Sequence, residues 1–175
     1  MQRVPVQRAF VGIGANLDNP ESGVRRAIAA VASIPGTRVL ASSSLYQTTP
    51  VGYLDQPDFV NAVAEIETRL DPGHLLEQLL LIEARFGRKR TTRNAPRTLD
   101  LDLLLYGDRC MNSPRLTLPH PRMAERAFVL IPLAEIAPDV VVGSLGSAAQ
   151  LVQGIPADGV SLLGEAGDLL ASGAV

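Results

Sequence analysis

The sequence predicts a single α+β domain, a ferredoxin-like α/β sandwich in which a mostly antiparallel sheet is flanked by helices. Segments with strand-like alternation and segments with helix-like apolar spacing follow one another as two β-α-β-like halves. Prolines and glycines separate these segments. The chain has 175 residues, of which 46% are hydrophobic, which is enough for a packed core. We expect the helices to cover one face of the sheet.

The first half begins with a predicted strand over residues 8–13, which ends in a glycine-containing stretch. Residues 20–33 are a predicted helix with Asn19 as its N-cap and a proline in its first turn. Residues 37–46 form the second predicted strand, which is β-branched at first and then rich in serine. A loop over residues 47–57 follows, and a long ordered loop between strands is usually functional.

The second half repeats this order. Residues 58–67 alternate well and predict a third strand. Residues 71–86 predict a second helix with Asp71 as its N-cap. The central strand follows over residues 97–107, and residues 123–135 predict a third helix that an internal proline kinks or ends.

The composition changes after residue 139. Residues 147–153 predict a short helix. Residues 154–175 are rich in Gly, Ala and Ser and hold few large apolar residues, which predicts weak order. We therefore expect a main domain over residues 1–142 and a C-terminal extension over residues 143–175.

Charge and cysteine content limit the class of protein. The formal net charge of −2 argues against a general nucleic-acid binder, because such proteins usually carry a net positive charge. The single cysteine, Cys110, cannot form an internal disulfide and fits a reducing compartment. Residues 1–8 lack the apolar core of a signal peptide, and no apolar run is long enough to span a membrane. We expect a cytoplasmic protein that binds neither nucleic acid nor membranes.

The central strand carries two aspartates in an otherwise apolar run. Because side chains alternate faces along a strand, Asp100 and Asp102 point the same way, roughly 7 Å apart. Such a pair is costly in an apolar setting unless a divalent cation binds it. Cationic residues precede the pair along the chain: Arg85, Arg88, Lys89, Arg90, Arg93 and Arg97. This composition is typical of a phosphoryl-transfer site, but it fits equally well an edge strand whose wet face pairs with the arginines.

Three further features each have two interpretations. Gly12 and Gly14 either permit a close approach to the backbone or form a tight strand-to-helix turn, which the glycines alone favour; Leu17 stands where a dinucleotide-binding loop needs its third glycine. Asn61 within a strand is suited either to reading the edge of a ring or to pairing with a loop carbonyl. His120 lies between two prolines, either as a donor to phosphate or as a surface residue of a stiff loop.

Four motifs occur in order along the chain: Gly12-x-Gly14-x-Asn16-Leu17, Asp55-Gln56-Pro57-Asp58-Phe59-Val60-Asn61, Pro96-Arg97-Thr98-Leu99-Asp100-Leu101-Asp102 and Leu118-Pro119-His120-Pro121-Arg122-Met123. Together they resemble the 6-hydroxymethyl-7,8-dihydropterin pyrophosphokinase family of the folate pathway. The resemblance extends from about residue 10 to residue 139, and the motif with the two aspartates is its most specific part. It favours the metal-ligand interpretation of that pair.

The resemblance implies a reaction in which the terminal diphosphate of ATP moves to the hydroxymethyl oxygen of 6-hydroxymethyl-7,8-dihydropterin and AMP is released. Asp100 and Asp102 would hold two Mg²⁺ ions that bridge the triphosphate. The family's catalysis depends on positioning and electrostatics, without a covalent enzyme intermediate. The implied partners are therefore ATP and the pterin, and we expect a monomer.

The resemblance also assigns roles to other residues. A catalytic role falls to the arginines of a cationic loop, Arg88, Arg90, Arg93 and Arg97. Pterin binding falls to Thr48, Phe59, Asn61 and Phe128, with the phenylalanine rings stacked on the two faces of the pterin. Nucleotide binding falls to Glu83, Arg97, Leu99, Arg115, Leu116, Thr117, His120 and Arg126, with the adenine held by backbone groups.

Parts of the pattern fit other classes of protein. A nucleotidyltransferase or phosphohydrolase also uses paired acids and Mg²⁺, but releases pyrophosphate or phosphate. An RNA-binding module on the same sandwich needs a basic, aromatic-rich sheet face, whereas this chain is 4% aromatic. The cationic loop departs from the family pattern, because Asn94 follows Arg93 where the family often has an aromatic residue. Ala95 stands where glycine is usual.

Overall fold

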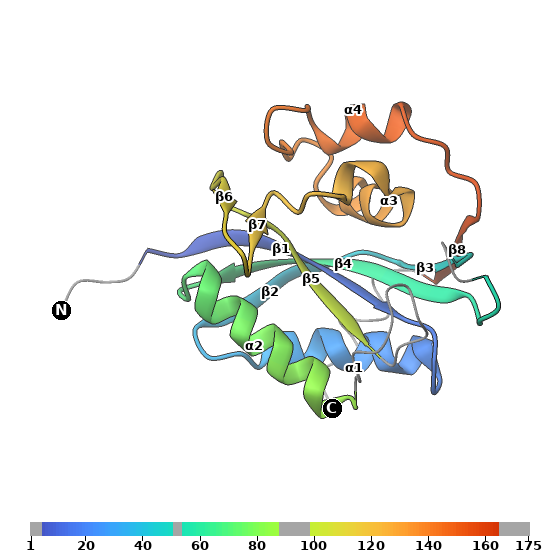
Figure 1. Ribbon diagram of the computed structural model, residues 1–175, viewed down its shortest axis with the longest axis horizontal. Coiled ribbons are helices and arrows are strands. Elements are labelled where there is room, and N and C mark those ends of the chain that lie inside the picture. The colour runs from blue at the N-terminus through green and yellow to red at the C-terminus, as the bar shows by residue number, and fades with distance from the viewer. Residues whose placement is uncertain (1–4, 51–53, 88–98, 165–175) are drawn as a thin grey trace.

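The computed structural model describes residues 5–50, 54–87 and 99–164. A central sheet lies between two layers of helices (Figure 1). Along the chain the elements are β1 (Gln7–Ala15), α1 (Pro20–Ala32), β2 (Thr37–Ser42), β3 (Leu45–Thr48), β4 (Phe59–Thr68), α2 (Pro72–Arg85), β5 (Asp100–Tyr106), β6 (Met111–Asn112), β7 (Thr117–Leu118), the 3-10 helix η1 (Met123–Glu125), α3 (Ala127–Ile136), α4 (Ala148–Gln153) and β8 (Val160–Gly164).

The strands of the main sheet follow the order β5-β1-β4-β3-β8, and β2 also pairs with β4. Every pairing in this sheet is antiparallel over the described residues. The element order from β1 to β5 and the central position of β1 and β4 are those of a ferredoxin-like sandwich. The predicted fold class is therefore confirmed.

The predicted strand over residues 37–46 is two strands, β2 and β3, separated by an interruption at Ser43 and Ser44. The hydroxyl of Ser43 accepts a hydrogen bond from the backbone N–H of Val63 at 2.9 Å and donates one to the carbonyl of Ser44 at 2.8 Å. These local bonds replace the regular strand ladder, as serine side chains often do. The prediction of one continuous strand was wrong for this reason.

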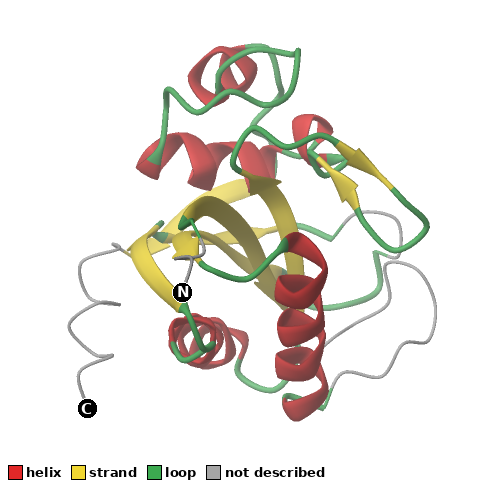
Figure 2. Ribbon diagram, turned by 90° about the vertical axis from the view of Figure 1, so that its left-hand side faces the viewer, coloured by secondary structure: helices red, strands yellow, loops and turns green. Residues whose placement is uncertain are grey.

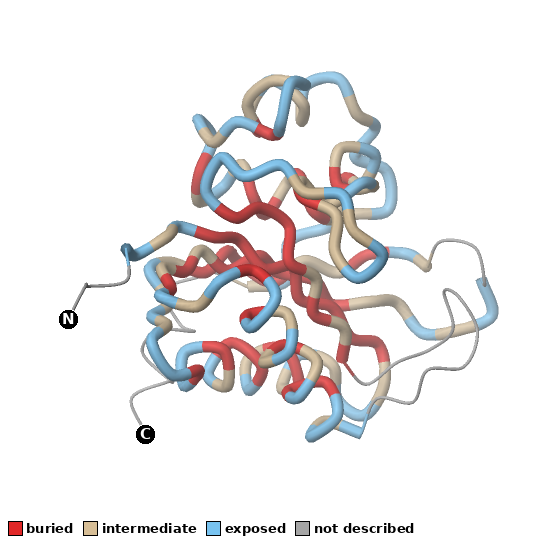
Figure 3. Tube along the Cα trace, turned by 60° about the vertical axis from the view of Figure 1, so that its left-hand side comes forward, coloured by how far each residue is buried: buried red, intermediate tan, exposed pale blue. Residues whose placement is uncertain are grey.

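Helices cover both faces of the sheet, not one as predicted (Figures 1 and 2). Helices α1 and α2 pack on one face around a core that includes Val24, Leu79 and Leu103. Helices α3 and α4 pack on the other face around Val63 and Leu133. The buried segments run through the centre of the sheet (Figure 3), because its strands carry apolar residues on both faces.

The predicted third helix over residues 123–135 is two helices, η1 and α3. Arg126 separates them, because its backbone is extended at φ −116° and ψ 106°. Pro132 lies inside α3, which continues to Ile136. Thus the proline does not end the helix.

The C-terminal part of the chain is more regular than its composition predicts. The short predicted helix is confirmed as α4, which Ser147 and Gln150 cap reciprocally. Residues 160–164 were expected to be weakly ordered, but they form β8 and pair with β3. Backbone pairing at an open sheet edge needs no buried side chains, and Leu162 of β8 is 61% exposed. Residues 165–175 lie outside the described part.

None of the helices in the described ranges combines the length and the apolar character that a bilayer crossing requires.

Candidate active site

Strand β5 holds the two aspartates at an edge of the sheet. Leu99, Leu101 and Leu103 point into the core beneath α1 and α2, whereas Asp100 and Asp102 are half-buried and face the opposite side. The predicted alternation is therefore confirmed. The alternative interpretation of the pair, as the wet face of an edge strand that pairs with the arginines, also requires this edge position. The predicted catalytic arginines, Arg88, Arg90, Arg93 and Arg97, lie outside the described residues.

The glycines of the first motif lie within β1, between the aspartates and Asn61. Gly12 pairs with Asp102, and Gly14 pairs with Asp100 on one side and with Asn61 on the other. The expected strand-to-helix turn was wrong, because β1 continues past both glycines to Ala15. A Cβ atom at Gly14 would lie only 2.6 Å from Oδ1 of Asn61. The glycines therefore leave space on the sheet face between β5 and β4.

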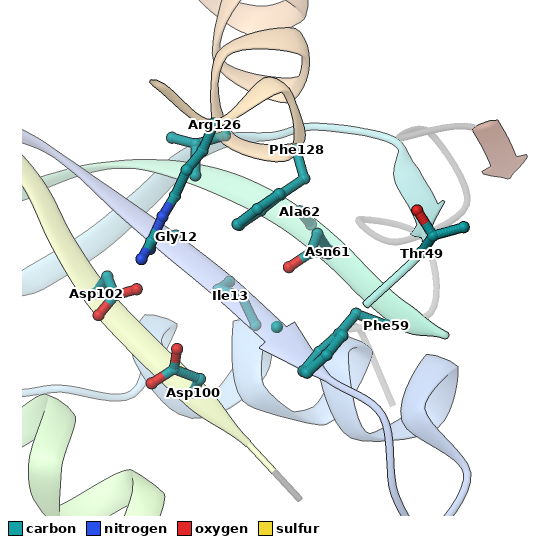
Figure 4. Close-up of a pocket in the computed structure, with 12 residues that line it drawn as sticks. Gly12, Ile13, Thr49, Phe59, Asn61, Ala62, Asp100, Asp102, Arg126 and Phe128 are labelled. Atoms are coloured by element: carbon teal, nitrogen blue, oxygen red, sulfur yellow. The ribbon is translucent and has the colours of Figure 1, made fainter. Parts of the chain in front are cut away.

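A first cavity occupies this space beneath the start of α3 (Figure 4). The rings of Phe59 from β4 and Phe128 from α3 lie on either side of the Asn61 side chain, and the two aspartates form the opposite wall. The cavity is lined by Gly12, Ile13, Gly14, Thr49, Phe59, Asn61, Ala62, Asp100, Asp102, Arg126, Phe128 and Val129. Aromatic walls with few polar groups suit a flat, polar-edged ring.

Asn61 is buried, and its amide nitrogen donates a hydrogen bond of 2.7 Å to the hydroxyl of Thr48. Its partner is thus a side-chain hydroxyl and not the loop carbonyl that was one interpretation. Thr48 is itself buried and does not line the cavity, whereas its neighbour Thr49 does. Thr48 therefore orients Asn61 from behind.

A second cavity lies beside β5, between α2 and the β6–β7 hairpin. It brings together five of the residues predicted for nucleotide binding: Glu83, Arg115, Leu116, Thr117 and His120. Asp100 and Asp102 line both cavities, so the carboxylates stand where the two cavities adjoin. Two other predicted residues lie elsewhere: Leu99 is fully buried in the core, and Arg126 lines the first cavity.

Glu83 fixes the edge strand to helix α2. The carboxylate is buried and accepts the backbone N–H of Leu101 at 2.9 Å. An edge strand presents backbone groups that no neighbouring strand satisfies, and a buried carboxylate is a strong acceptor for one of them. Glu83 thereby sets the position of Leu101 between the aspartates.

His120 presents one ring nitrogen as a donor. Its Nδ1 accepts the backbone N–H of Arg122 at 3.2 Å, so the neutral ring carries its proton on Nε2. Burial lowers the pKa of His120, the Arg126 and Arg122 guanidinium groups lower it further, and Asp100 opposes them. The ring is therefore a neutral donor near pH 7, at the rim of the second cavity.

Arg126 places a positive charge close to the aspartates. Its guanidinium carbon lies 5.6 Å from the centre of the Phe128 ring, and its terminal nitrogens point across the first cavity toward Asp102 (Figure 4). The guanidinium group is thus positioned to compensate negative charge between the two cavities.

The side chain of Asn16 has a structural role that was not predicted from the sequence. This side chain is buried and donates to Oε1 of Gln56 at 2.7 Å and to the carbonyl of Pro57 at 3.0 Å. It therefore ties the first motif to the segment that leads into Phe59. The sequence offered one signal for this role, a polar residue at the end of an apolar strand.

Comparisons with known proteins identify the family of the chain. Residues 10–138 match the family model of 7,8-dihydro-6-hydroxymethylpterin-pyrophosphokinase (HPPK). A 2-amino-4-hydroxy-6-hydroxymethyldihydropteridine pyrophosphokinase from Pseudomonas aeruginosa is 44% identical over 158 residues, 90% of this chain and 98% of that protein. Its namesake from Bacillus subtilis is 45% identical over 132 residues, 75% of this chain and 79% of that protein.

A crystal structure of Plasmodium falciparum HPPK-DHPS with pterin and p-hydroxybenzoate shares the fold. The TM-score is 0.71 at 14% identity, over 87% of this chain and 42% of that one. Residues 10–138, which match the family model, include all four motifs and every residue that lines the two cavities. The chain therefore belongs to the 7,8-dihydro-6-hydroxymethylpterin-pyrophosphokinase family.

Proposed function

We propose that this protein transfers the terminal diphosphate of ATP to the hydroxymethyl oxygen of 6-hydroxymethyl-7,8-dihydropterin and releases AMP, a step in tetrahydrofolate biosynthesis. The main support is that two different cavities adjoin at Asp100 and Asp102. The first is lined by two phenylalanine rings, and the second is lined by Arg115 and His120. Membership in the family, with relatives named for this activity, supports it.

The first cavity suits the pterin. Phe59 and Phe128 offer ring faces on both sides of a planar ligand, and the Asn61 amide offers a donor and an acceptor to its edge. The hydroxymethyl group would then point toward the aspartates, where the second cavity begins. The side chains therefore bind the acceptor and aim its oxygen.

The second cavity suits the nucleotide. His120 offers an Nε2–H donor to a phosphate oxygen, and Arg115 adds a guanidinium group at the hairpin. Arg88, Arg90, Arg93 and Arg97 are proposed to bind the triphosphate as well. Backbone groups near Leu99, Leu101 and Thr117 are proposed to hold the adenine.

Asp100 and Asp102 fit Mg²⁺. Within the described ranges no group of three or more His, Cys, Asp or Glu residues is placed to hold a metal ion. The pair alone would leave most coordination positions to phosphate oxygens and water, which is how Mg²⁺ is usually bound. When bound, two Mg²⁺ ions would neutralise charge on the triphosphate.

The residues of the site act by position and charge. In the transfer, the hydroxymethyl oxygen forms a bond to the β-phosphorus while the bond from that phosphorus to the oxygen of AMP breaks. Arg126 stands close to both cavities and would stabilise negative charge that develops between them. The proposed transfer is direct and involves no covalent intermediate with a side chain of the protein.

Product analysis tests the proposal. Phosphorus NMR of a mixture of protein, ATP, Mg²⁺ and the pterin alcohol should show AMP and the pterin diphosphate. Formation of ADP, or of free pyrophosphate in the absence of pterin, would overturn diphosphate transfer. Asp100→Asn and Asp102→Asn should lower kcat by about two to four orders of magnitude while keeping the fold. Asp108→Asn, on an exposed turn, is the matched control.

We further propose that the protein acts as a monomer in the cytoplasm on small molecules alone. The support is that described residues of one chain line both cavities. Light scattering at assay concentration should give the mass of one chain, and activity that rises with the square of protein concentration would contradict it.

A further inference from the structure

Glu135, in the last turn of α3, accepts hydrogen bonds from Ser44, which directly precedes β3, and from Tyr46 within β3. Its two carboxylate oxygens lie 3.1 and 3.0 Å from the backbone nitrogen of Ser44. One oxygen also accepts the Ser44 hydroxyl at 2.9 Å, and the other accepts the Tyr46 hydroxyl at 2.5 Å. A single side chain thus ties the helix to the strand through several directional bonds.

The two tied elements carry different walls of the first cavity. Helix α3 begins beside the cavity with Phe128, about 10 Å along the helix axis from Glu135. Strand β3 ends at Thr48, whose hydroxyl orients Asn61. The separation between the Phe128 ring and the Asn61 amide therefore depends on how α3 sits on the paired strands β3 and β4.

Apolar packing and the Glu135 hydrogen bonds together hold α3 on the sheet. Leu130 and Leu133 of α3 are fully buried against the sheet and hold the helix down. These close-packed apolar side chains resist displacement of the helix, but they supply no directional bonds to the sheet. The Glu135 bonds have defined geometry, and they fix both the rotation and the axial position of α3.

The donors stay in their bonding form. Burial raises the pKa of Tyr46, and its hydrogen bond to Glu135 and the charge of that carboxylate raise it further. Tyr46 therefore remains a protonated donor throughout the physiological range. Within the described residues Glu135 does not line either cavity, so any effect on substrate must pass through α3 and β3.

We propose that Glu135 is a positioning residue for the pterin, which sets the spacing between the aromatic wall on α3 and the amide on β4. The inference rests on the proposed function, because it assumes that the first cavity takes the pterin. It predicts an effect confined to one of the two substrates, since the nucleotide cavity borders β5, α2 and the β6–β7 hairpin.

Three variants test it. Glu135→Gln keeps the shape of the side chain but places an amide NH₂ group where a carboxylate oxygen accepts hydrogen bonds from Ser44 and Tyr46. Tyr46→Phe removes only the hydrogen bond of the Tyr46 hydroxyl, with little change in the fold. Glu67→Gln is the matched control, because it breaks an ion pair of 2.6 Å with Arg38 near the far end of β4. For each variant we would measure pterin affinity by fluorescence with a non-hydrolysable ATP analogue and Mg²⁺, and the KM of both substrates, below the melting temperature.

Glu135→Gln should weaken pterin binding and raise the pterin KM about five- to tenfold, with a smaller rise for Tyr46→Phe. The ATP KM of Glu135→Gln and of Tyr46→Phe should stay within about twofold of wild type. For the control Glu67→Gln, the pterin KM and the ATP KM should both stay within that range. Unchanged pterin affinity in folded Glu135→Gln and Tyr46→Phe, or an equal rise in both KM values, would overturn the inference. Failure of the wild-type protein to form AMP would instead overturn the proposed function.

Discussion

The amide nitrogen of Asn61 lies 2.7 Å from the hydroxyl oxygen of Thr48, and both residues are buried. This bond joins adjacent strands, because Asn61 is on β4 and Thr48 is at the end of β3. It leaves the remaining polar capacity of the Asn61 amide for the cavity that the side chain lines. A residue outside the cavity thus determines which way a cavity residue faces.

Replacing Thr48 with valine should therefore weaken pterin binding. Valine keeps the shape but removes the acceptor, which leaves a buried N–H of Asn61 without that partner at a cost of about 1–3 kcal/mol. We expect a roughly tenfold higher pterin KM, measured in steady-state assays, and a lower free energy of unfolding in urea. Thr48→Ser keeps the hydroxyl and should behave like wild type. Wild-type pterin binding by Thr48→Val would contradict this role.

Gly14→Ala should disturb the site more than Gly12→Ala. The new Cβ atom at position 14 would lie 2.6 Å from Oδ1 of Asn61, whereas at position 12 its nearest neighbour is Cδ2 of Leu104 at 3.4 Å. Overpacking of this kind costs about 1–3 kcal/mol, and here it also displaces Asn61. Thermal melts and pterin titrations should rank the two variants in that order. The reverse ranking would mean that Gly14 is not needed for the placement of Asn61.

Glu83→Ala should impair the nucleotide side. The change removes the acceptor of the Leu101 backbone N–H from a buried position, and we expect it to lower the free energy of unfolding by about 2 kcal/mol. Because β5 then loses an anchor to α2, the ATP KM should rise more than the pterin KM. Glu21→Ala, which breaks an exposed pair with Arg25, is the control and should leave both KM values unchanged. An ATP KM equal to that of wild type would argue against Glu83 as a support of that cavity.

The N-terminus of α2 should give the protein a pH-dependent stability. Asp71 accepts both the backbone N–H of His74 at 2.9 Å and its ring Nδ1 at 2.6 Å. The side-chain hydrogen bond and charge of Asp71 raise the pKa of His74 above 6.5, and the hydrogen bonds from His74 lower the pKa of Asp71 below 3.8. The folded state thus binds more protons at His74, and fewer at Asp71, than the unfolded state does.

The contribution of His74 is therefore complete below pH 6.5 and is lost as the pH rises through its folded pKa. The contribution of Asp71 is present above pH 3.8 and is lost as the pH falls through its own lowered pKa. Urea unfolding between pH 4 and 9 should show the difference between wild type and His74→Gln shrinking toward alkaline pH. NMR titration of the imidazole gives the folded pKa directly, and a value at or below 6.5 would contradict the coupling.

Local pattern was enough to predict most of the fold. The period-two alternation around Asp100 and Asp102 predicted which face each side chain occupies, because that period depends only on the strand itself. The N-cap at Asp71 was predictable for the same reason, since a cap involves residues a few positions apart. The interruption at Ser43 and Ser44 was missed, because serine is compatible with a strand and the Ser43 hydroxyl bonds to Val63 on another strand.

Features that depend on which strands meet could not be predicted from local pattern. The role of Gly14 follows from its position opposite both Asp100 and Asn61, and that register exists only in the folded sheet. The bonds of Glu135 span 91 residues to Ser44 along the chain, so no sequence window contains both partners. The resemblance singled out Phe59 and Phe128, which periodicity alone assigns to a core; both line the first cavity, and their binding role stays a prediction.

The pairing of β3 with β8 affects how the protein is made. A ribosome delivers β3 early, but its partner, Val160–Gly164, leaves the exit tunnel much later. Until then the outer backbone groups of β3 are open to pairing with strands of other nascent chains. In the folded chain β8 therefore closes this edge of β3, and it does so only late in synthesis, even though its own side chains contribute little to the core.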